Sequence, residues 1–165
     1  MQSMENTQSM SEVTVYNLLK DKGYSEEAIA GIMGNIAVET GGTFDYKQKQ
    51  KNGNGYGLFQ FDFMKKHYND YLKENDIEDS AAAQIDFMHD TIYGNKQDLI
   101  GSGTAKYIQE IMQSPYPEDI ASGFMNEWER PSVPHESKRQ MEAIKYYNFP
   151  VVENLDKTGF ESTIK

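Results

Sequence analysis

Apolar residues recur at intervals of three and four along most of this chain, and short stretches rich in glycine, serine and proline separate the repeating segments. Such spacing places apolar side chains on one face of a helix. It predicts helices over residues 11–22, 26–39, 62–74, 81–93, 104–113, 117–129 and 135–147. Ser25, Asp62 and Ser80 are candidate N-caps, and Pro117 lies at a favourable first helical position. The chain is therefore expected to be mainly α-helical.

The segment 26–39 is expected to be the central helix. Apolar residues cover more than half of its circumference, and small residues lie between them. Two of these are Gly31 and Gly34, each of which costs about 1 kcal/mol relative to alanine inside a helix. We therefore expect another backbone to approach closely at these glycines and to offset their cost.

The segment 43–61 is polar and irregular by comparison. Phe44 and Tyr46 alternate with polar residues, and the run NGNG at residues 52–55 tolerates positive φ angles. This pattern predicts a short β-hairpin of two or three strands. Together with the helices it gives an α+β, mainly α fold in a single domain.

The chain of 165 residues is long enough for one domain with its own core. We expect a flexible leader at residues 1–10, because this polar stretch lacks the basic region and the apolar core of a secretory signal. The folded domain is expected at residues 11–147, and a C-terminal tail or linker at residues 148–165, where the periodicity is lost. No stretch of the sequence approaches the roughly 18 apolar residues of a membrane span.

Charge narrows the set of expected partners. The net charge is −10, from 26 acidic and 16 basic residues. Such a chain offers no basic stripe to phosphates, so neither nucleic acid nor an anionic membrane is an expected partner. The sequence has no cysteine, which excludes a disulfide framework and a thiolate metal site. His67, His89 and His135 lie on separate predicted elements, so we expect neither a metal site nor a cofactor.

Glu39 is the most informative acidic residue. It closes the apolar segment 26–39, and the glycine-rich run GYGLFQF follows at residues 55–61. Apolar surroundings disfavour a charged carboxyl and keep its proton available near neutral pH. A protonated carboxyl that faces a glycine-lined backbone and the amide of Gln60 suits a glycan-cleaving cleft, because the glycosidic leaving oxygen needs a proton. The alternative is that Glu39 is a solvated carboxylate near a helix end.

Three segments carry a resemblance to a known family. GIMGNIAVETGG at residues 31–42, GYGLFQF at residues 55–61 and FMNEWERP at residues 124–131 resemble the lysozyme superfamily, and within it the phage tail lysozymes and lytic transglycosylase-like enzymes. The likeness covers residues 12–147. It implies a lysozyme-like fold, in which a central helix ends at the catalytic glutamate, Glu39, beside a small β-hairpin.

The resemblance also implies a function. The expected reaction is cleavage of the β-1,4 bond between N-acetylmuramic acid and N-acetylglucosamine in peptidoglycan, with Glu39 as general acid and later as base. The family's substrate-binding hairpin matches Tyr56, Gly57, Leu58 and Gln60, so we expect these four residues to line the glycan cleft.

One departure from the hen-type lysozymes leaves the mechanism open. Those enzymes carry an aspartate where this chain has Gly55. Inverting hydrolysis would need another acid to position a water molecule, and the candidates are Asp45 and Asp62, each of which also suits a turn or a helix cap. Alternatively the 6-hydroxyl of the substrate attacks after Glu39 switches from acid to base, and an anhydro-sugar forms as in lytic transglycosylases.

The segment FMNEWERP contains two further candidates. Trp128 is interpreted as a core residue because it lies in an apolar-periodic helix with Phe124, although a tryptophan can also stack on a sugar ring. Glu129 and Arg130 either form a structural ion pair or face the cleft.

The resemblance suggests a phage source, as a virion component that perforates the wall during entry (a tail lysin) or as an endolysin. The expected partners are peptidoglycan glycan strands and other virion proteins. The protein would reside in the virion or in the host cytoplasm before release, and it would act on the bacterial cell wall in the periplasm. An alternative of another class is an inactive glycan-binding or structural module of the virion.

Overall fold

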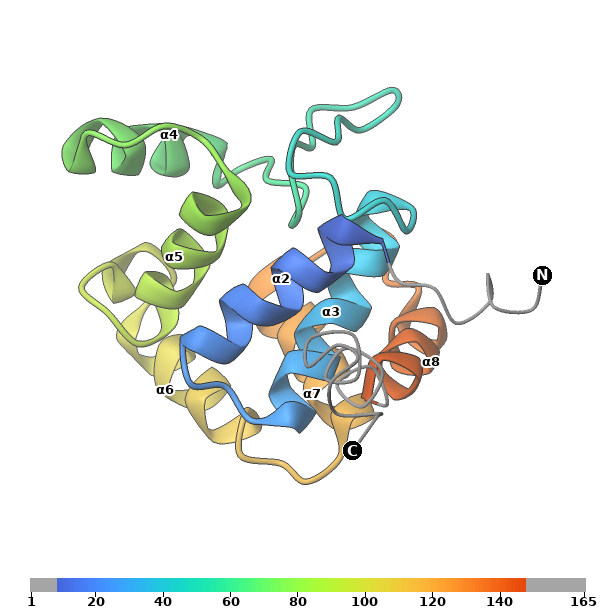
Figure 1. Ribbon diagram of the computed structural model, residues 1–165. Coiled ribbons are helices and arrows are strands. Elements are labelled where there is room, and N and C mark those ends of the chain that lie inside the picture. The colour runs from blue at the N-terminus through green and yellow to red at the C-terminus, as the bar shows by residue number, and fades with distance from the viewer. Residues whose placement is uncertain (1–8, 148–165) are drawn as a thin grey trace, which may run out of the picture.

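The computed structural model describes residues 9–147, and Figure 1 shows the arrangement of their helices. The α-helices in this range are α2 (Met10–Asp21), α3 (Glu26–Thr40), α4 (Lys65–Asn75), α5 (Ala81–Ile92), α6 (Ser102–Ile111), α7 (Pro117–Phe124) and α8 (Glu136–Tyr147). A 3₁₀ turn, η1 (Gln97–Leu99), precedes α6, and a π-helical turn, η2 (Met125–Glu129), continues α7. The prediction of a mainly α-helical fold is confirmed. None of these helices combines the length and the apolar character that a membrane crossing requires.

Parts of the expected leader and tail lie outside the described residues. This holds for residues 1–8 and for the whole segment 148–165. The last two residues of the expected leader form the start of α2. Ser9 is the N-cap and forms a capping box with Glu12, and Met10 is the first helical residue.

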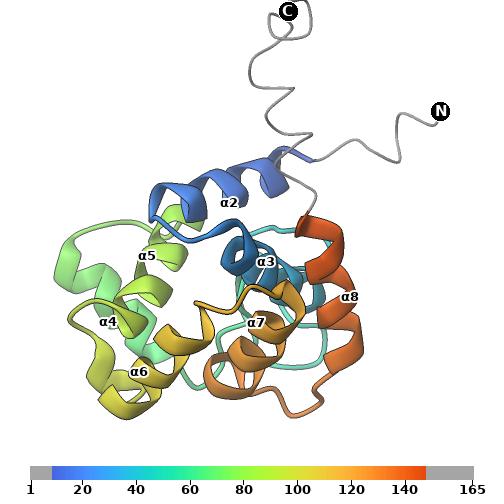
Figure 2. The same cartoon turned by 90° about the horizontal axis from the view of Figure 1, so that it is seen from below.

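Helix α3 lies at the centre of the fold, as predicted, and Figures 1 and 2 show α2, α7 and α8 around it. Its glycines lie where the other helices come closest. A Cβ atom at Gly31 would lie 2.7 Å from Cγ2 of Ile120 in α7, and one at Gly34 would lie 2.7 Å from the carbonyl oxygen of Arg139 in α8. The close approach predicted from the glycines is confirmed, and it brings α7 and α8 directly onto α3.

Local signals in the sequence determine several helix ends. Ser25 and Ser80 cap α3 and α5 by accepting hydrogen bonds from backbone amides of the first turn, and Pro117 is the first residue of α7. The prediction that Asp62 caps a helix is wrong. Helix α4 begins only at Lys65, and no side chain caps it.

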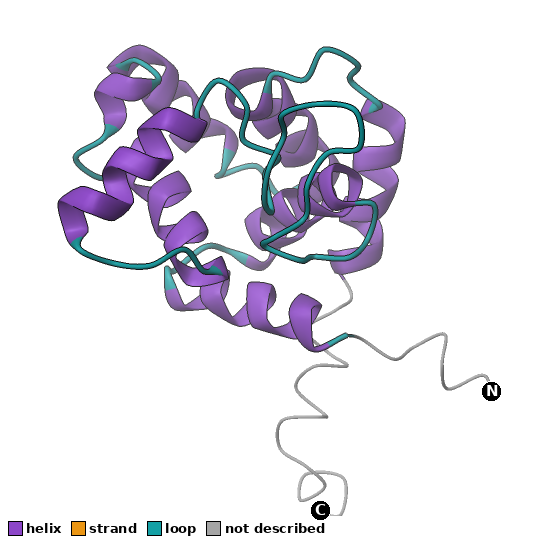
Figure 3. Cartoon of the chain, turned by 90° about the horizontal axis from the view of Figure 1, so that it is seen from above, coloured by secondary structure: helices purple, strands orange, loops and turns teal. Residues whose placement is uncertain are grey.

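The predicted β-hairpin is not present among the described residues. The segment between α3 and α4 contains only two isolated antiparallel bridges, Lys49 with Tyr56 and Tyr56 with Phe61. Figure 3 draws the segment as loop throughout. Gly57 and Gln60 adopt positive φ angles of 87° and 51°, so the backbone turns before a second pair of residues can extend either bridge into a ladder.

Aromatic side chains anchor this loop to the helices. Phe59 and Phe61 are buried and pack against Trp128 at ring-centroid distances of 5.1 and 6.2 Å. Trp128 stacks on Phe124 and donates its indole N–H to the hydroxyl of Thr91. The interpretation of Trp128 as a core residue is confirmed. The loop therefore has a fixed position although it has no regular secondary structure.

Candidate active site

A cleft of about 460 Å³ opens between the C-terminal end of α3 and the loop that precedes α4. Most of its lining comes from the last turn of α3, residues 59–64 of the loop, residues 128–133 after α7, and Arg139 of α8. The volume lies within the range of roughly 300–1,000 Å³ that is typical of small-ligand sites. The cleft is therefore large enough to hold part of a glycan strand.

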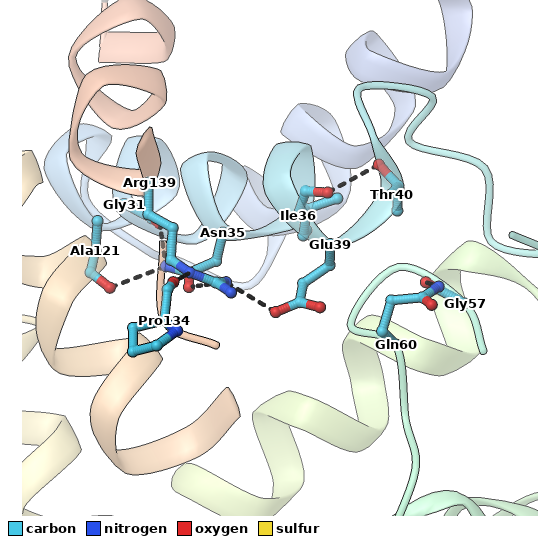
Figure 4. A network of polar contacts seen from close by, with 10 residues as sticks. All are labelled: Gly31, Asn35, Ile36, Glu39, Thr40, Gly57, Gln60, Ala121, Pro134 and Arg139. Atoms are coloured by element: carbon cyan, nitrogen blue, oxygen red, sulfur yellow. Dashed lines mark hydrogen bonds and ion pairs between the residues drawn. The ribbon is translucent and has the colours of Figure 1, made fainter. Parts of the chain in front are cut away.

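Glu39 lies in the last turn of α3 with its side chain 14% exposed. Gly41 ends the helix in the left-handed conformation, with a φ angle of 64°. Thr40 fixes the start of the following loop, because its hydroxyl donates to the carbonyl oxygen of Ile36 and accepts from the amide of Phe44. Figure 4 shows the Glu39 carboxyl directed toward the space between α3 and the loop. Glu39 is thus mostly buried, unlike the solvated carboxylate of the alternative interpretation.

Arg139 of α8 holds the carboxyl group of Glu39. Its Nη1 donates to Oε2 of Glu39 at 2.8 Å and to Oδ1 of Asn35 at 2.9 Å, and its Nε donates to the carbonyl oxygen of Pro134 at 2.6 Å. The Arg139 side chain is only 2% exposed. A buried charge needs both an opposite charge and further hydrogen bonds, and Arg139 has both.

Asn35 links three helices behind this ion pair. Its Nδ2 donates to the carbonyl oxygen of Gly31 in its own helix and to that of Ala121 in α7, and its Oδ1 accepts from Arg139 in α8. The side chain is fully buried. Figure 4 shows these contacts together, with Asn35 between Arg139 and the backbone of Ala121. The position of the Arg139 guanidinium is therefore fixed by α3 and α7 as well as by α8.

Two opposing effects act on Glu39. Burial raises the pKa of its carboxyl, because the charged form loses hydration. The charge and the hydrogen bond of Arg139 lower it, and the charge of His135 lowers it further. Burial prevails, so the pKa of Glu39 lies above its ordinary value. This direction favours retention of a proton toward neutral pH, which a general acid requires.

Glu129 is a second carboxyl in the same cleft. It is the last residue of the π-helical turn η2, whose geometry differs from that of the α-helix expected over residues 117–129. Its Oε2 is buried and has no hydrogen-bond partner among the residues that the structure describes. Burial raises the pKa of Glu129 well above its ordinary value, and the charge of Glu39 raises it further, while Arg139 opposes both effects.

The suggested ion pair between Glu129 and Arg130 is not among the contacts of the described residues. The guanidinium of Arg130 instead lies over the ring of Phe63, 5.5 Å from its centroid. Both Glu129 and Arg130 line the cleft. The other interpretation, that they face the cleft, therefore describes their position.

Gln60 is the one residue of the expected substrate-binding set that lines the cleft. Its Nε2 donates to the carbonyl oxygens of Gln48 and Gly57 at 2.9 and 2.8 Å, so the side chain also braces the loop. Gly57 is buried against Gln84, and Leu58 is fully buried in the core. The structure does not bring Gly57 and Leu58 to the cleft lining, because the loop turns these positions inward.

Tyr56 also lies away from the cleft lining. Its hydroxyl donates to one carboxylate oxygen of Asp79, and the hydroxyl of Tyr68 donates to the other. The ammonium group of Lys65 lies over the Tyr56 ring, 4.7 Å from its centroid. These contacts join the loop to α4 and to the residues before α5.

The two aspartates predicted as second carboxylates have different positions. Asp45 is exposed and outside the cleft lining, and its carboxylate accepts a hydrogen bond from the backbone amide of Lys47, as in a turn. Asp62 is exposed and lines the cleft. Of the two, only Asp62 therefore shares the cleft lining with the candidate acid.

Sequence reasoning did not identify Arg139 and Asn35. One signal was available for Arg139, because it lies four and seven residues before Ala143 and Tyr146, which are buried on the same face of α8. An arginine on such a face needs a buried acid or carbonyl partner. No comparable signal marks Asn35, whose role depends on the distant carbonyl oxygen of Ala121.

The described residues offer no group of three or more histidine, cysteine, aspartate or glutamate side chains that could hold a metal ion. His89 forms a hydrogen bond with the Tyr24 hydroxyl at 2.9 Å and stacks on Tyr93, and His135 lines the cleft by itself. The polar side chains of the cleft lining therefore offer carboxyls, guanidiniums, amides, an imidazole and one hydroxyl, that of Ser132.

Comparison with known proteins identifies the family. No similar protein was found among proteins with curated descriptions. The model of the phage tail lysozyme family matches residues 11–149, which is most of the chain and includes the whole cleft. The chain therefore belongs to the phage tail lysozyme family, whose members degrade the peptidoglycan of the bacterial cell wall.

Proposed function

We propose that this protein cleaves the β-1,4 bond between N-acetylmuramic acid and N-acetylglucosamine in peptidoglycan, with Glu39 as the general acid. One observation carries the proposal. Glu39 lies mostly buried at the end of the central helix, and its carboxyl lines a cleft of about 460 Å³. Membership of the phage tail lysozyme family supports peptidoglycan as the substrate.

The proposed reaction begins with a proton transfer. Glu39 gives its proton to the oxygen that bridges the two sugars, and the bond between this oxygen and the anomeric carbon breaks with its electron pair on the oxygen. The attacking group must then lose a proton: the ionised Glu39 accepts it when the attacker is the 6-hydroxyl of the substrate, whereas a second carboxylate on the opposite face of the sugar accepts it when the attacker is water. Arg139 stabilises the carboxylate formed in the first step, because its Nη1 is already hydrogen-bonded to Oε2 of Glu39.

The attacking group decides between two reaction types. Attack by water gives hydrolysis and a reducing muramic acid end, whereas attack by the 6-hydroxyl of the same sugar gives an anhydro end. For hydrolysis we propose Asp62 as the group that positions water, since it lines the cleft and Asp45 does not. We place muramidase activity first and transglycosylation second, with the same general acid in both.

Binding of the glycan is proposed to rely on shape and hydrogen bonds. The chain carries a net charge of −10, so long-range attraction to an anionic wall polymer is weak. The cleft instead offers the side chain of Gln60 and the guanidinium of Arg130 at its lining. Glycan strands of the bacterial wall are therefore the proposed partner, and other virion proteins would supply delivery to the wall.

The test is the release of soluble fragments from purified peptidoglycan by the wild type and by Glu39→Gln. This variant keeps the size of the side chain but cannot donate a proton as an acid. A matched control is Glu110→Gln, which removes the same charge from an exposed position on α6 outside the cleft lining. We expect a loss of at least about 100-fold in kcat for Glu39→Gln, since general acid catalysis contributes about 10²–10⁴-fold, and no loss for the control.

Mass analysis of the fragments then distinguishes the reaction types. Reducing muramic ends identify hydrolysis, and anhydro ends identify transglycosylation. Equal activity of the wild type and Glu39→Gln would show that another residue is the acid. A folded wild type that binds peptidoglycan without cleaving it would contradict the enzymatic proposal and would favour a glycan-binding module.

A further inference from the structure

Two of the carboxyls that line the cleft, those of Glu39 and Glu129, are at least partly buried, and they share the cleft with one buried cation. Glu39 and Glu129 both line it, and Arg139 is the buried cation that the two carboxyls have in common. Arg139 contacts Oε2 of Glu39 directly, whereas Oε2 of Glu129 is buried without a hydrogen-bond partner among residues 9–147. The single guanidinium therefore cannot neutralise two carboxylates.

The remaining charged groups of the cleft are more exposed. His135 and Arg130 belong to the segment between α7 and α8, Asp62 belongs to the loop before α4, and all three residues line the cleft as exposed residues. Their charges are screened by water, so they act weakly on a buried oxygen. The protonation state of Glu129 is therefore determined mainly by its own burial, by Glu39 and by Arg139.

Charge balance among Glu39, Glu129 and Arg139 favours one bound proton shared by the two carboxyls. With both carboxyls ionised, two negative charges would share one buried positive charge in the same cleft. With one proton bound, the group of Glu39, Glu129 and Arg139 is neutral. Two like charges in one partly desolvated cleft disfavour simultaneous ionisation, so the protons should leave in two separate steps that belong to the pair.

We propose that Glu129 is a positioning residue that shares a single proton with Glu39, so that the cleft keeps one proton available for cleavage when solution pH would otherwise remove it. The proposal rests on the proposed function of Glu39 as general acid. In one state the proton is on Glu129 and Glu39 is paired with Arg139. In the other state the proton is on Glu39, ready for the glycosidic oxygen, and Arg139 balances the charge of Glu129.

The π-helical turn explains how Glu129 reaches this position. The amide of Arg130 donates to the carbonyl oxygen of Met125, five residues earlier, which widens the last turn after α7. Arg130 ends the turn with a positive φ angle of 51°. In the same turn Trp128 is held in the core by its hydrogen bond to Thr91. With its neighbour fixed in this way, Glu129 is held at the cleft.

The proposal is tested without substrate by an NMR titration. The protein is labelled with ¹³C-glutamate, and the chemical shifts of the side-chain carboxyl carbons are followed as a function of pH. We expect the Glu39 signal of the wild type to change in two steps. In Glu129→Gln it should change in one step, with a midpoint at least about one pH unit below the upper step of the wild type. Glu127→Gln, in the same π-helical turn but outside the cleft lining, should keep both steps.

Steady-state kinetics with peptidoglycan as substrate provide a second test of the proposal. The alkaline limb of the pH profile of kcat should move down by about one pH unit in Glu129→Gln, and KM should change less than twofold, since Oε2 of Glu129 is buried and the substitution keeps the size of the side chain. Glu129→Asp keeps an ionisable carboxyl and should restore most of the alkaline activity. A merely structural role would lower thermal stability without moving this limb.

Two results would overturn the proposal. The first is a single-step titration of Glu39 in the wild type, with Glu129 ionised independently. The second is an identical Glu39 midpoint in the wild type and in a folded Glu129→Gln. The wild-type titration decides the matter even if the variant fails to fold. It also separates this proposal from the proposed function, because an inactive protein can still show coupled titration and an active one can lack it.

Discussion

The contact between α3 and α8 at Gly34 leads to a quantitative prediction for Gly34→Ala. A Cβ atom at this position would lie 2.7 Å from the carbonyl oxygen of Arg139 and 2.8 Å from the amide nitrogen of Ala143. Ordinary contacts begin at 3.4 Å, so α8 would have to move by several tenths of an ångström. Both atoms belong to the backbone, and no side-chain rotation can relieve the overlap.

The expected magnitude follows from two opposing effects. Overpacking of this kind typically costs about 1–3 kcal/mol, and replacement of glycine by alanine inside a helix returns up to about 1 kcal/mol. We expect a net loss of roughly 1–2 kcal/mol in the free energy of unfolding. The overlap also displaces the backbone of Arg139, so the ion pair with Glu39 should weaken and kcat should fall together with stability.

Urea unfolding measured by circular dichroism checks this prediction. The control is Gly103→Ala in α6, where a Cβ atom meets nothing within 4 Å. Gly103→Ala should leave stability unchanged or raise it by up to about 1 kcal/mol, and it should leave kcat unchanged. If Gly34→Ala were as stable as Gly103→Ala, the close approach of α8 to α3 would be refuted, and with it the account of how Arg139 is placed.

Three further predictions concern the cleft and its support. Arg139→Met should cost about 3 kcal/mol of stability, because it leaves buried polar groups without their cation. It should also raise the pKa of Glu39 further. Urea unfolding measures the first effect and the pH profile of kcat the second, with Arg139→Lys as the control that keeps the charge. Trp128→Phe should cost about 1–3 kcal/mol through the lost hydrogen bond to Thr91 and the lost ring area; thermal unfolding near that of the wild type would contradict it. Burial raises the pKa values of Glu39 and Glu129 in the folded state. The two protonated carboxyls therefore contribute fully to folding stability below the unfolded pKa of about 4.3, and this contribution is lost as pH rises through the folded pKa values. Urea unfolding between about pH 4 and 8 should therefore show declining stability, and a smaller decline in Glu129→Gln.

The sequence predicts the helical part of the fold well, because local signals determine it. The apolar spacing of residues 26–39 identifies the central helix, and Gly31 and Gly34 identify the side on which other helices approach. Serine and proline at helix starts act within one turn of backbone, so Ser25, Ser80 and Pro117 are where local reasoning places them.

The loop between α3 and α4 shows where local reasoning fails. Alternating apolar residues and the NGNG run favour a hairpin, but the buried ring of Phe59 and the inward Leu58 determine the path of the chain through contacts with distant helices. Positive φ angles at Gly57 and Gln60 then prevent a ladder. Tertiary packing thus overrides a local preference that is weak for strands.

The candidate site is predictable only in part for the same reason. Glu39 follows from its own helix, whereas Arg139 lies 100 residues later and Asn35 depends on the backbone of α7. The position of Glu129 depends on a π-helical turn that α-helical periodicity does not reveal. Residues that act through partners from other helices carry little signal in a single sequence.

The link between Glu39 and Arg139 has a consequence for the synthesis of this protein. The acid belongs to α3, whereas its cation belongs to α8, which follows about 100 residues later along the chain. A nascent chain that ends before α8 carries the carboxyl but neither its guanidinium nor the helix that closes one side of the furrow. Any chemistry that depends on this pair therefore requires α8 to be synthesised and packed against α3, and a product truncated before α8 should lack it.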